Sequence, residues 1–406
     1  MTPTIDTLKA TSEAQVAEAV TWAGEKGRRI EVRGAGSKAA IGRPIGADLI
    51  LDLGGLTGVL DYAPAELVLT ARAGTGLAEV EAVLAEAGQM LAFEPIDYGP
   101  LLGGAAGAAT LGGLIASNAS GPRRLKDGAA RDHFLGFQAV SGRGEAFKAG
   151  GKVVKNVTGY DLSKLMAGSW GTLAVLTEVT LKVLPRPQTA ATLIISGLTD
   201  ADAARAMSLA VGSPADVSGA AHLPAPIAAR AGLGADAATA LRLEGFGPSV
   251  VARLQTLTEK LAPFGALTSL DAEHTAGLWA FIRDVRAFAG DERPVWRISA
   301  PPISGPAIAA AIQAEAAAEF FYDWAGGLTW LAVAPSPDAG AAVVRRATAA
   351  NGGHATLIRA PAETRASVAV FEPEQPALAA LTRRVRASFD PLSLLGPGRM
   401  HPEAGA

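Results

Sequence analysis

The first segment whose residue types and spacing suggest chemistry is the stretch RGAGSK, residues 33–38. It follows a short segment with the apolar character of a β-strand. Gly34, Gly36 and Ala39 fit the GxGxxA pattern of dinucleotide-binding Rossmann folds. Asp52 lies near the position at which such folds place an acidic residue for the ribose. On this interpretation the segment is a pyrophosphate-binding turn.

The residues after this turn argue against a Rossmann fold. In that fold the turn leads directly into a helix whose N-terminus holds the pyrophosphate. Here three helix-breaking residues follow within ten positions, namely Gly42, Pro44 and Gly46. A nest of consecutive backbone N–H groups can hold a phosphate without a helix, and Ala35 and Ser37 are small enough to leave those groups open. A tight turn between two strands, without a ligand, is the alternative.

A second glycine-rich stretch reads GGAAGAATLGGLIASNASG, and its glycine content is too high for one stable helix along its whole length. Thr110 places a hydroxyl beside Gly112 and Gly113, which suits close backbone contact with a flat or phosphorylated ligand. Ser117 and Asn118 add short donors and acceptors one helical turn later. The alternative is a packing segment between a sheet and a helix.

Residue types that would support other chemistry are scarce. The chain has no cysteine, which excludes disulfides, thiolate metal sites and cysteine-bound iron–sulfur clusters on this chain. No two histidines have the i, i+3 or i, i+4 spacing of helical metal ligands, and no Ser-His-Asp arrangement is supported. We therefore predict no metal site. The five histidines are His133, His222, His274, His354 and His401.

The composition is that of a globular protein. The 406 residues carry a formal net charge of -3, 49% are hydrophobic and 18% are charged. This balance does not predict binding to nucleic acid or to a membrane surface. Residues 1–10 lack the apolar core of an export signal, and no apolar run approaches the roughly 20 residues that span a bilayer.

The sequence predicts secondary structure for much of the chain. Ser12 and Gln15 have the spacing of a capping box, and apolar residues follow at helical spacing as far as Gly27. Further helices are expected at 77–87 and 376–389. Strands are expected at 29–33, 48–53, 66–73, 134–141, 175–184 and 367–371. No repeat of fixed period is found.

Three motifs make the interpretation specific. They read TLGGLIASNASGPRR, KNVTGYDLSKLMAGSWGTLAVLTEVTLKVLPRP and, near the C-terminus, GPGRM. These motifs resemble the FAD-binding domain of the vanillyl-alcohol oxidase-type flavoproteins. Within that superfamily the chain is most similar to the FAD-binding subunits of bacterial glycolate oxidases (glycolate dehydrogenases). The resemblance covers about the first 187 residues and the C-terminal tail, and residues 188–340 share only a general similarity.

This resemblance implies an FAD site on the segments described above. RGAGSK falls where the superfamily keeps its pyrophosphate loop, and the second stretch would lie along the rest of the cofactor. Gly128, Arg131 and Val175 are weaker candidates carried over from the family. The implied cofactor-binding residues are therefore Arg33, Gly34, Ala35, Gly36, Ser37, Lys38, Thr110, Gly112, Gly113, Ser117, Asn118, Gly128, Arg131 and Val175. The motifs assign no catalytic residue.

Two departures from the family bear on the chemistry. Many relatives attach flavin covalently through a histidine in the phosphate loop, and because RGAGSK has none, non-covalent FAD is expected. Related 2-hydroxy-acid dehydrogenases carry an HxGDGNxH metal signature, which this chain lacks. His354, in a GGHATLIRAP stretch that matches the glycolate oxidase subunit, is interpreted as a hydrogen-bonded turn residue.

Two groups of polar residues have more than one interpretation. KNVTGYD supplies Lys155, Asn156, Tyr160 and Asp161, either as polar groups near the flavin or as caps of the next helix. Between Gly121 and Gly159 there are eight Lys or Arg and three Asp or Glu. These cations either contact the dinucleotide phosphates or an anionic substrate, or form a solvated face or a docking surface.

The expected fold class is α+β. We expect a two-lobed FAD-binding domain of vanillyl-alcohol oxidase type over residues 1–187 and a smaller α/β cap domain over 188–340. A C-terminal segment, 341–406, would pack back on the FAD domain. Pro185 and Pro187 in LPRPQ mark the clearest boundary.

Three functions are compatible with these observations. The first is an FAD-binding subunit of a complex that oxidises glycolate to glyoxylate, in which this chain relays electrons or supports assembly. The resemblance implies a paralogous FAD subunit and an iron–sulfur subunit as partners, and a cytoplasmic location or one at the inner membrane through them. The second is a free-standing FAD oxidoreductase of an alcohol or 2-hydroxy acid, with Arg or Tyr side chains of the second domain around the substrate. The third is a scaffold whose flavin fold has lost its function.

Overall fold

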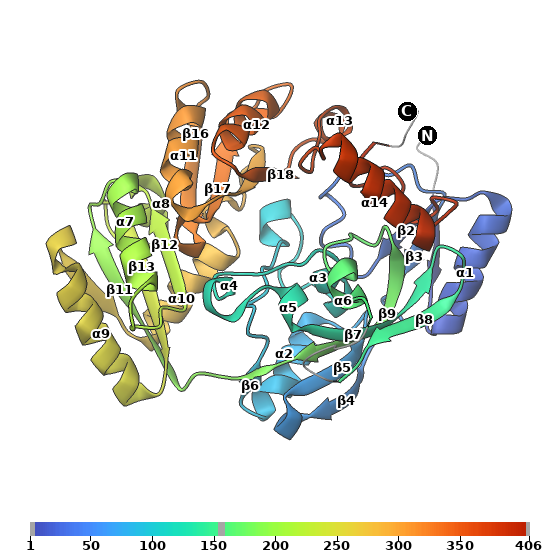
Figure 1. Ribbon diagram of the computed structural model, residues 1–406, viewed down its shortest axis with the longest axis horizontal. Helices are drawn as coiled ribbons and strands as arrows, with labels where there is room; N and C mark the ends of the chain where they lie inside the picture. Colours follow the sequence, from blue (N-terminus) through green and yellow to red (C-terminus); the bar gives the residue numbers. More distant parts are fainter. Residues whose placement is uncertain (1–4, 153–158, 403–406) are drawn as a thin grey trace. The chain divides into compact units, whose positions relative to one another are not determined.

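The computed structural model describes residues 5–152 and 159–402, and the chain divides into two compact units (Figure 1). Unit 1 comprises Met1–Ala119, Ala129–Pro185 and Pro373–Ala406. Unit 2 comprises Ser120–Gly128 and Arg186–Glu372. The division at Pro185 falls in the LPRPQ sequence, where a proline-rich boundary is expected.

The first lobe of unit 1 is a small parallel sheet with one long helix. Helix α1 (Glu13–Lys26) begins after Ser12, whose Oγ accepts a hydrogen bond from the Gln15 N–H at 3.2 Å, and it ends at Gly27 with φ +60°. The Gln15 side chain accepts from the N–H of Thr11 instead of completing the capping box. Three strands follow the order β1-β3-β2, namely β1 (Asp6–Lys9), β2 (Ile30–Arg33) and β3 (Leu49–Asp52).

The second lobe of unit 1 is a five-stranded antiparallel sheet in the order β4-β5-β9-β7-β8. Its three central strands are those predicted at 66–73, 134–141 and 175–184, and their ends agree within two residues. The strands are β4 (Val59–Ala63), β5 (Val68–Arg72), β7 (Phe134–Ser141), β8 (Ala146–Gly150) and β9 (Ala174–Lys182). Around them lie α2 (Leu77–Glu86), α3 (Leu111–Ala116), α5 (Ala130–His133), α6 (Leu162–Met166) and a two-stranded pair, β6 (Gln89–Met90) with β10 (Leu184–Pro185).

The C-terminal tail of unit 1 returns to the first lobe. After α14 (Pro376–Phe389), the Ile30 N–H donates to the carbonyl of Leu394, and the Gly396 N–H donates to the carbonyl of Ile30. Leu394 and Leu395 are buried in the core that α1, β2 and β3 share. The tail therefore extends the parallel sheet beside β2, the strand that leads into RGAGSK.

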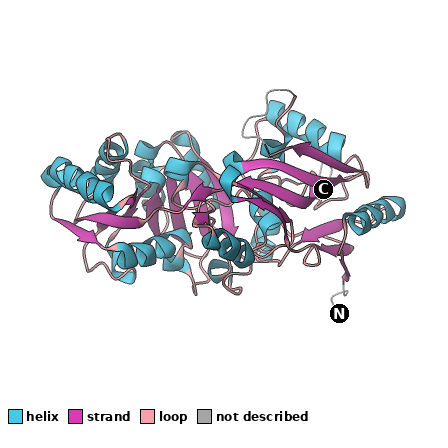
Figure 2. Ribbon diagram, turned by 90° about the horizontal axis from the view of Figure 1, so that it is seen from below, coloured by secondary structure: helices cyan, strands magenta, loops and turns pink. Residues whose placement is uncertain are grey.

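Unit 2 contains one antiparallel sheet of eight strands in the order β14-β11-β13-β12-β16-β17-β15-β18. Helices flank these strands (Figure 2). The strands are β11 (Thr189–Ser196), β12 (Gly219–Leu223), β13 (Ala238–Gly245), β14 (Leu267–Leu270), β15 (Val295–Ser299), β16 (Ala318–Asp323), β17 (Leu328–Val333) and β18 (His354–Arg359). The helices are α4 (Arg124–Asp127), α7 (Asp200–Val211), α8 (Ala225–Arg230), α9 (Gly247–Leu261), α10 (Ala272–Arg283), α11 (Gly305–Gln313), α12 (Ala341–Ala350) and α13 (Ala362–Ser367).

The sheet of unit 2 is a structural duplication that the sequence does not reveal. The four strands β11 to β14 lie in the order 4-1-3-2, and β15 to β18 lie in the same order reversed. In each half a helix follows the first strand and another follows the third, which is the β-α-β-β-α-β pattern of ferredoxin-like motifs. The halves meet where β12 pairs with β16.

Alternation along the strands gives this sheet two different faces. Leu193 and Ile195 of β11 pack with α7 and α9, and Ile298 of β15 packs with α11 and α12. Successive side chains of a strand point to opposite faces. Arg242 of β13, which follows a core leucine, and Arg297 of β15, which precedes Ile298, therefore belong to the other face. The second face thus includes charged side chains, and Arg242 on it is buried against the Trp279 ring of α10.

Two predictions for the C-terminal third are corrected by the structure. The predicted strand at 367–371 is wrong. Arg345 of α12 donates to the carbonyls of Ala369, Val370 and Phe371, and although the Leu357 N–H of β18 also donates to Val370, this contact does not extend into a strand pairing. Residues 341–372 also belong to unit 2, since β18 pairs with β15. The segment that returns to unit 1 thus begins at Pro373 instead of residue 341.

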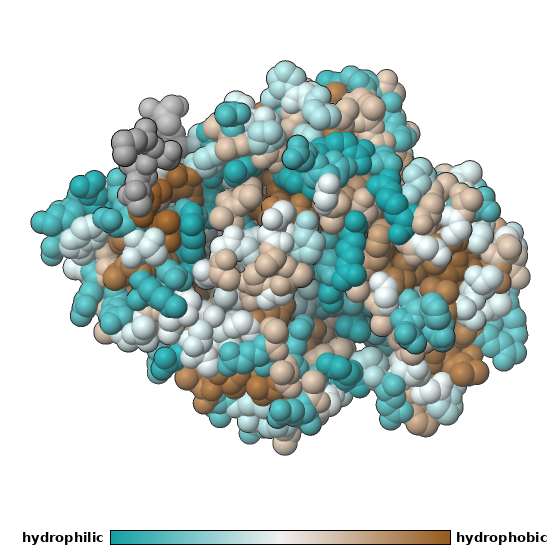
Figure 3. Space-filling view, turned by 180° about the vertical axis from the view of Figure 1, so that it is seen from behind, coloured by the Kyte–Doolittle hydropathy of each residue, from teal (hydrophilic) through white to brown (hydrophobic). Residues whose placement is uncertain are grey.

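No membrane-spanning element was found in the described part of the chain. None of the helices within 5–152 and 159–402 has both the length and the apolar character that crossing a bilayer requires. On the face shown in Figure 3, apolar residues lie in separate patches between hydrophilic ones.

The tail depends on one buried carboxylate, and this gives a stability prediction. Asp390 accepts hydrogen bonds from the N–H groups of Leu394 (3.0 Å) and Leu395 (2.8 Å) and is 3% exposed. We expect Asp390→Ala to reduce the free energy of unfolding by about 2–4 kcal/mol, because two buried donors lose a charged acceptor. Thermal unfolding should show a midpoint several degrees lower. Asp236→Ala, at an exposed aspartate, is the control, and equal midpoints for the two variants would contradict this role of Asp390.

Candidate functional site

The RGAGSK loop connects β2 to β3 without any helix. Residues 34–48 are all described and contain neither helix nor strand, so the GxGxxA match does not produce a Rossmann turn. Gly36 has φ +73°, a conformation that glycine adopts without strain. None of the described residues accepts a hydrogen bond from the backbone N–H groups of residues 34–38. The loop thus offers consecutive free amides, which is the arrangement of an anion-binding nest.

The two glycine-rich segments lie side by side. A Cβ atom on Gly34 would lie 2.2 Å from Oγ1 of Thr110, and a Cβ atom on Gly112 would lie 2.7 Å from Cβ of Ala73. Real Cβ atoms do not approach other atoms so closely, so each position requires glycine. The bare backbone at these two places lets the phosphate loop contact the start of α3.

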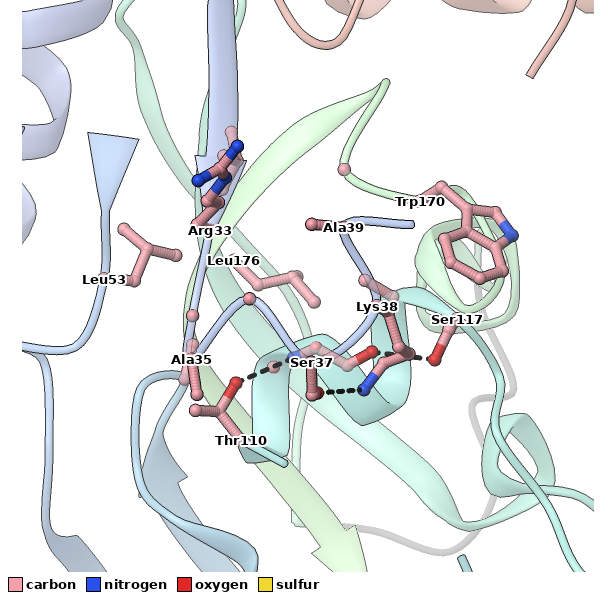
Figure 4. Close-up of a pocket in the computed structure, with 18 of the residues that line it drawn as sticks. Arg33, Ala35, Ser37, Lys38, Ala39, Leu53, Thr110, Ser117, Trp170 and Leu176 are labelled. Atoms are coloured by element: carbon pink, nitrogen blue, oxygen red, sulfur yellow. Dashed lines mark hydrogen bonds between the residues drawn. The ribbon is translucent and has the colours of Figure 1, made fainter. Parts of the chain in front are cut away.

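One pocket lies between these segments, and it contains ten of the fourteen predicted residues (Figure 4). A second pocket shares Thr110 and residues 33–36 with the first and continues past Asp52 and Gly76. Both pockets are therefore lined by the loop and by Thr110. The predicted residues that line the first pocket are Arg33, Gly34, Ala35, Gly36, Ser37, Lys38, Thr110, Gly112, Gly113 and Ser117.

Short polar side chains line the pocket at α3. Thr110 caps the helix by accepting from the Gly113 N–H at 3.4 Å, and the Ser117 hydroxyl donates to the Gly113 carbonyl at 2.8 Å. Lys38 Nζ lies 3.4 Å from Ser37 Oγ. Figure 4 shows Ser37, Lys38, Thr110 and Ser117 together at this end of the pocket.

Positive groups surround the loop. Arg33 donates from Nη2 to Glu31 Oε2 at 2.8 Å, and among the described residues its buried Nε has no hydrogen-bond partner. Arg399 comes from the C-terminal GPGRM motif and donates to the carbonyls of Lys38 (3.0 Å) and Ile41 (3.2 Å). The tail thereby fixes the far end of the phosphate loop.

Lys38 has a lowered pKa in the pocket. Burial lowers the pKa of Lys38 to about 8, and the positive charge of Arg399 acts in the same direction. Asp97 opposes this shift. An anionic ligand at the loop would favour the ammonium form, so ligand binding and protonation of Lys38 are coupled.

Four predicted residues lie outside this pocket. Val175 is fully buried in the core of the first lobe, and its neighbours Ala174 and Leu176 line the pocket because they point to the opposite face of β9. The Asn118 side chain accepts from the N–H of Arg131 at 3.0 Å. Arg131 itself is exposed, and Gly128 ends α4 in unit 2.

Several pocket residues were not predicted from the sequence. Trp170 has φ +55°, an uncommon conformation for a bulky residue, and its ring lies 5.5 Å from the Arg399 guanidinium carbon. Both residues belong to the motifs MAGSWGTL and GPGRM, so family motifs carried a signal for them. Leu53 and Ala73 also line the pocket, but only tertiary packing brings them there.

The structure describes Tyr160 and Asp161 of the KNVTGYD segment and the position of His354. Asp161 caps α6 by accepting from the Lys164 N–H, whereas the Tyr160 side chain is 92% exposed. Lys155 and Asn156 lie outside the described residues. His354 begins β18, where it pairs with Ser299. Within the described part of the chain, no group of three His, Asp or Glu side chains is placed to hold a metal ion.

The comparisons with known proteins agree with this geometry. The FAD binding domain family matches residues 7–150, which include the phosphate loop and α3. The crystal structure of p-cresol methylhydroxylase with substrate bound has a TM-score of 0.74 at 14% identity, covering 98% of this chain and 88% of that chain. The chain therefore has the predicted vanillyl-alcohol oxidase-type fold.

Two relatives are more similar in sequence. The glycolate oxidase subunit GlcD of Bacillus subtilis (strain 168) is 45% identical over 85 residues, which are 21% of this chain and 18% of that protein. The glycolate oxidase subunit GlcE of Escherichia coli (strain K12) is 35% identical over 377 residues, which are 92% of each protein. Since this similarity extends over nearly the full length of both proteins, the chain belongs to the GlcE family of glycolate oxidase subunits.

Proposed function

We propose that this chain is the FAD-binding subunit of an enzyme complex that oxidises glycolate to glyoxylate. The observation that carries the proposal is the run of unbonded N–H groups at residues 34–38, beside the bare backbone of Gly112 and Gly113. Similarity to GlcE of E. coli over almost the whole chain supports the choice of substrate.

The residues present fit an FAD molecule. The nest amides, Lys38 and the unpartnered Nε of Arg33 would hold the negatively charged diphosphate. Gly113, where a Cβ atom would lie 3.2 Å from Oγ1 of Thr110, would leave space for close contact at the start of α3. The residues that line the two pockets include no histidine, and the chain has no cysteine, so the site supports non-covalent binding.

The chemistry follows from the cofactor and from the charges around it. When bound, FAD accepts a hydride from the carbon that bears the hydroxyl group of a 2-hydroxy acid. Lys38 and Arg399 place positive charge beside the RGAGSK loop, where it would balance the negative charge of the diphosphate. The protein thus supplies binding, orientation and electrostatics.

Electrons must leave the reduced cofactor through another component. This chain has no cysteine and so cannot hold a cysteine-bound iron–sulfur cluster. The partners that complete such a complex are a paralogous FAD subunit and an iron–sulfur subunit. We place the complex in the cytoplasm, at the inner membrane only through these partners. In this arrangement the chain relays electrons or supports assembly.

Co-purification tests the proposal as a whole. A tag on this chain should recover stoichiometric FAD, a second flavin subunit and a cysteine-rich subunit, and the recovered complex should reduce an artificial dye with glycolate. A chain that is purified without flavin and takes up no added FAD would contradict the proposal and favour a scaffold. Glycolate-dependent dye reduction by the isolated, FAD-loaded chain would instead favour a free-standing enzyme.

The backbone contact at Gly34 gives a sharper prediction. We expect Gly34→Ala to weaken FAD binding at least tenfold, because the added Cβ atom would force the loop away from Thr110. A fluorescence titration of the apoprotein with FAD measures this effect. Gly247→Ala is the matched control, since a Cβ atom there would meet nothing within 4 Å. Wild-type FAD affinity in the folded Gly34→Ala protein would contradict the assignment.

The lowered pKa of Lys38 predicts how the affinity for FAD depends on pH. Below pH 8 the ammonium form already exists, so affinity should be constant. As the pH rises above about 8, binding must first protonate Lys38, and affinity should fall by up to about tenfold per pH unit. Lys38→Met should bind FAD more weakly at pH 7 and lose this slope, whereas the exposed Lys148→Met should keep it. An unchanged slope in Lys38→Met would show that another group is responsible.

A further inference from the structure

Helix α14 lies on the surface of unit 1 with little apolar packing. It has 14 residues, and none of its side chains is buried. A helix of this length is only marginally stable in water, and it normally gains stability from an apolar face that packs on the rest of the protein. In α14, however, Leu378 and Leu381 are 51% and 52% exposed. The helix therefore presents apolar side chains that the described part of the chain does not cover.

The turn after β7 and strand β8 hold the C-terminal end of α14. Arg143 in this turn donates from Nη2 to the carbonyl of Ser388 at 3.2 Å. The Phe389 ring lies 6.0 Å from the Phe147 ring of β8. Both contacts involve the last two residues of the helix, so its preceding turns keep an outer face open to solvent.

Small and basic side chains occupy this outer face. Residues three or four positions apart lie on the same side of a helix. The exposed residues on the outer side of α14 are Ala377, Ala380, Leu381, Arg384 and Ala387. The alanines would let another helix approach to about 8 Å, at the short end of the usual distance between helix axes. Arg384 places a guanidinium group between them.

The arginines of α14 have no carboxylate on the helix to balance them. The helix contains three Arg and no Asp or Glu. Within residues 5–152 and 159–402, no ion pair involves Arg383, Arg384 or Arg386. Glu374 precedes the helix and accepts a hydrogen bond from the Thr382 hydroxyl at 2.8 Å. The helix thus carries positive charge that no described carboxylate pairs with.

The turn after β7 adds to this charge. Arg143 and Glu145 are both exposed there. With the arginines of α14 and Glu374, they make four arginines against two glutamates, whereas the whole chain has a formal net charge of -3. We call α14 with Glu374, Arg143 and Glu145 the tail surface. Its charge is opposite in sign to that of the chain, so it favours a partner that carries carboxylates.

Two other occupants match the tail surface less well. In a twofold dimer the same surface of each copy meets itself, so arginines would face arginines. An anionic lipid surface binds a helix with a continuous apolar stripe, and the outer face of α14 has Arg384 between alanines. A protein surface with carboxylates around an apolar groove complements both the charge and the exposed leucines.

We infer that α14 docks onto an acidic surface of another subunit of the complex, with Arg383 and Arg384 opposite carboxylates of that subunit. The inference rests on the proposed function, because it gives a structural basis to the role of this chain in assembly. Leu378 and Leu381 supply the apolar contact, and the arginines select the partner and orient it.

Mass photometry of the co-purified, FAD-loaded complex on dilution tests the tail surface. Arg384→Glu should raise the apparent Kd between this chain and its partner at least tenfold, because a like charge replaces an opposite one. Leu381→Gln should raise it about threefold, because an apolar contact is lost. FAD content per copy of this chain should stay at the wild-type level, since no residue of α14 lines either pocket. Lys260→Glu, at an exposed lysine of α9, is the matched control and should leave the Kd unchanged.

Chemical cross-linking of the same complex identifies the occupant. Arg384→Lys keeps the positive charge and provides a primary amine, which a carbodiimide couples to a carboxylate in contact with it. We expect an amide bond between the introduced amine and an Asp or Glu of another subunit, located by mass spectrometry. The native amine of Lys260 should give no such product.

Three results would contradict the inference. They are an unchanged Kd in Arg384→Glu, a cross-link that is absent or joins only two copies of this chain, and binding to phosphatidylglycerol vesicles that Arg384→Glu abolishes while the Kd stays the same. A failure of the proposed function is distinguishable, because the wild-type chain would then recover no second flavin subunit or no FAD. That result would precede any variant and would overturn the inference with it.

Discussion

The contact between Gly34 and Thr110 is the constraint on which the proposed FAD site depends. A Cβ atom at Gly34 would overlap the threonine hydroxyl at 2.2 Å, so only a bare backbone lets the phosphate loop lie against the start of α3. The threonine in turn caps that helix, and Gly112 must approach Ala73 with equal closeness. Gly34 also belongs to the run of N–H groups, residues 34–38, for which no described residue accepts a hydrogen bond. Gly34 therefore serves both the packing of the loop against α3 and the proposed binding of FAD.

The rest of unit 1 holds this contact in place from two sides. The parallel sheet fixes the start of the loop at Arg33, and the C-terminal tail pairs beside β2 and brings Arg399 to the carbonyls of Lys38 and Ile41. Arg399 has a second effect, because its charge helps to lower the pKa of Lys38. Arg399, near the end of the chain, thus affects both the geometry of the RGAGSK loop and the protonation of Lys38.

Local signals in the sequence predicted much of the fold. Ser12 and Gly27 mark the ends of α1, and the apolar run at 134–141 is β7. The strand prediction at 367–371 failed where tertiary contacts decided the outcome, because the carbonyls of 369–371 accept hydrogen bonds from the Arg345 side chain and Val370 has a single backbone contact with β18. The duplication in unit 2 was also missed, because its two halves share strand order and not a sequence period. For the site, glycine spacing and family motifs located the loop and α3, whereas Leu53 and Ala73 needed the tertiary structure.

Hydrogen–deuterium exchange tests the central claim most directly. The N–H groups of residues 34–38 donate to no described residue of the protein, so in the FAD-free chain they should exchange rapidly. Addition of FAD should slow exchange in peptides that cover 34–38 and 110–113, while peptides of unit 2 strands such as β13 keep their rates. Unchanged exchange in the phosphate loop at saturating FAD would contradict the account, because the cofactor would then bind somewhere other than this bare backbone.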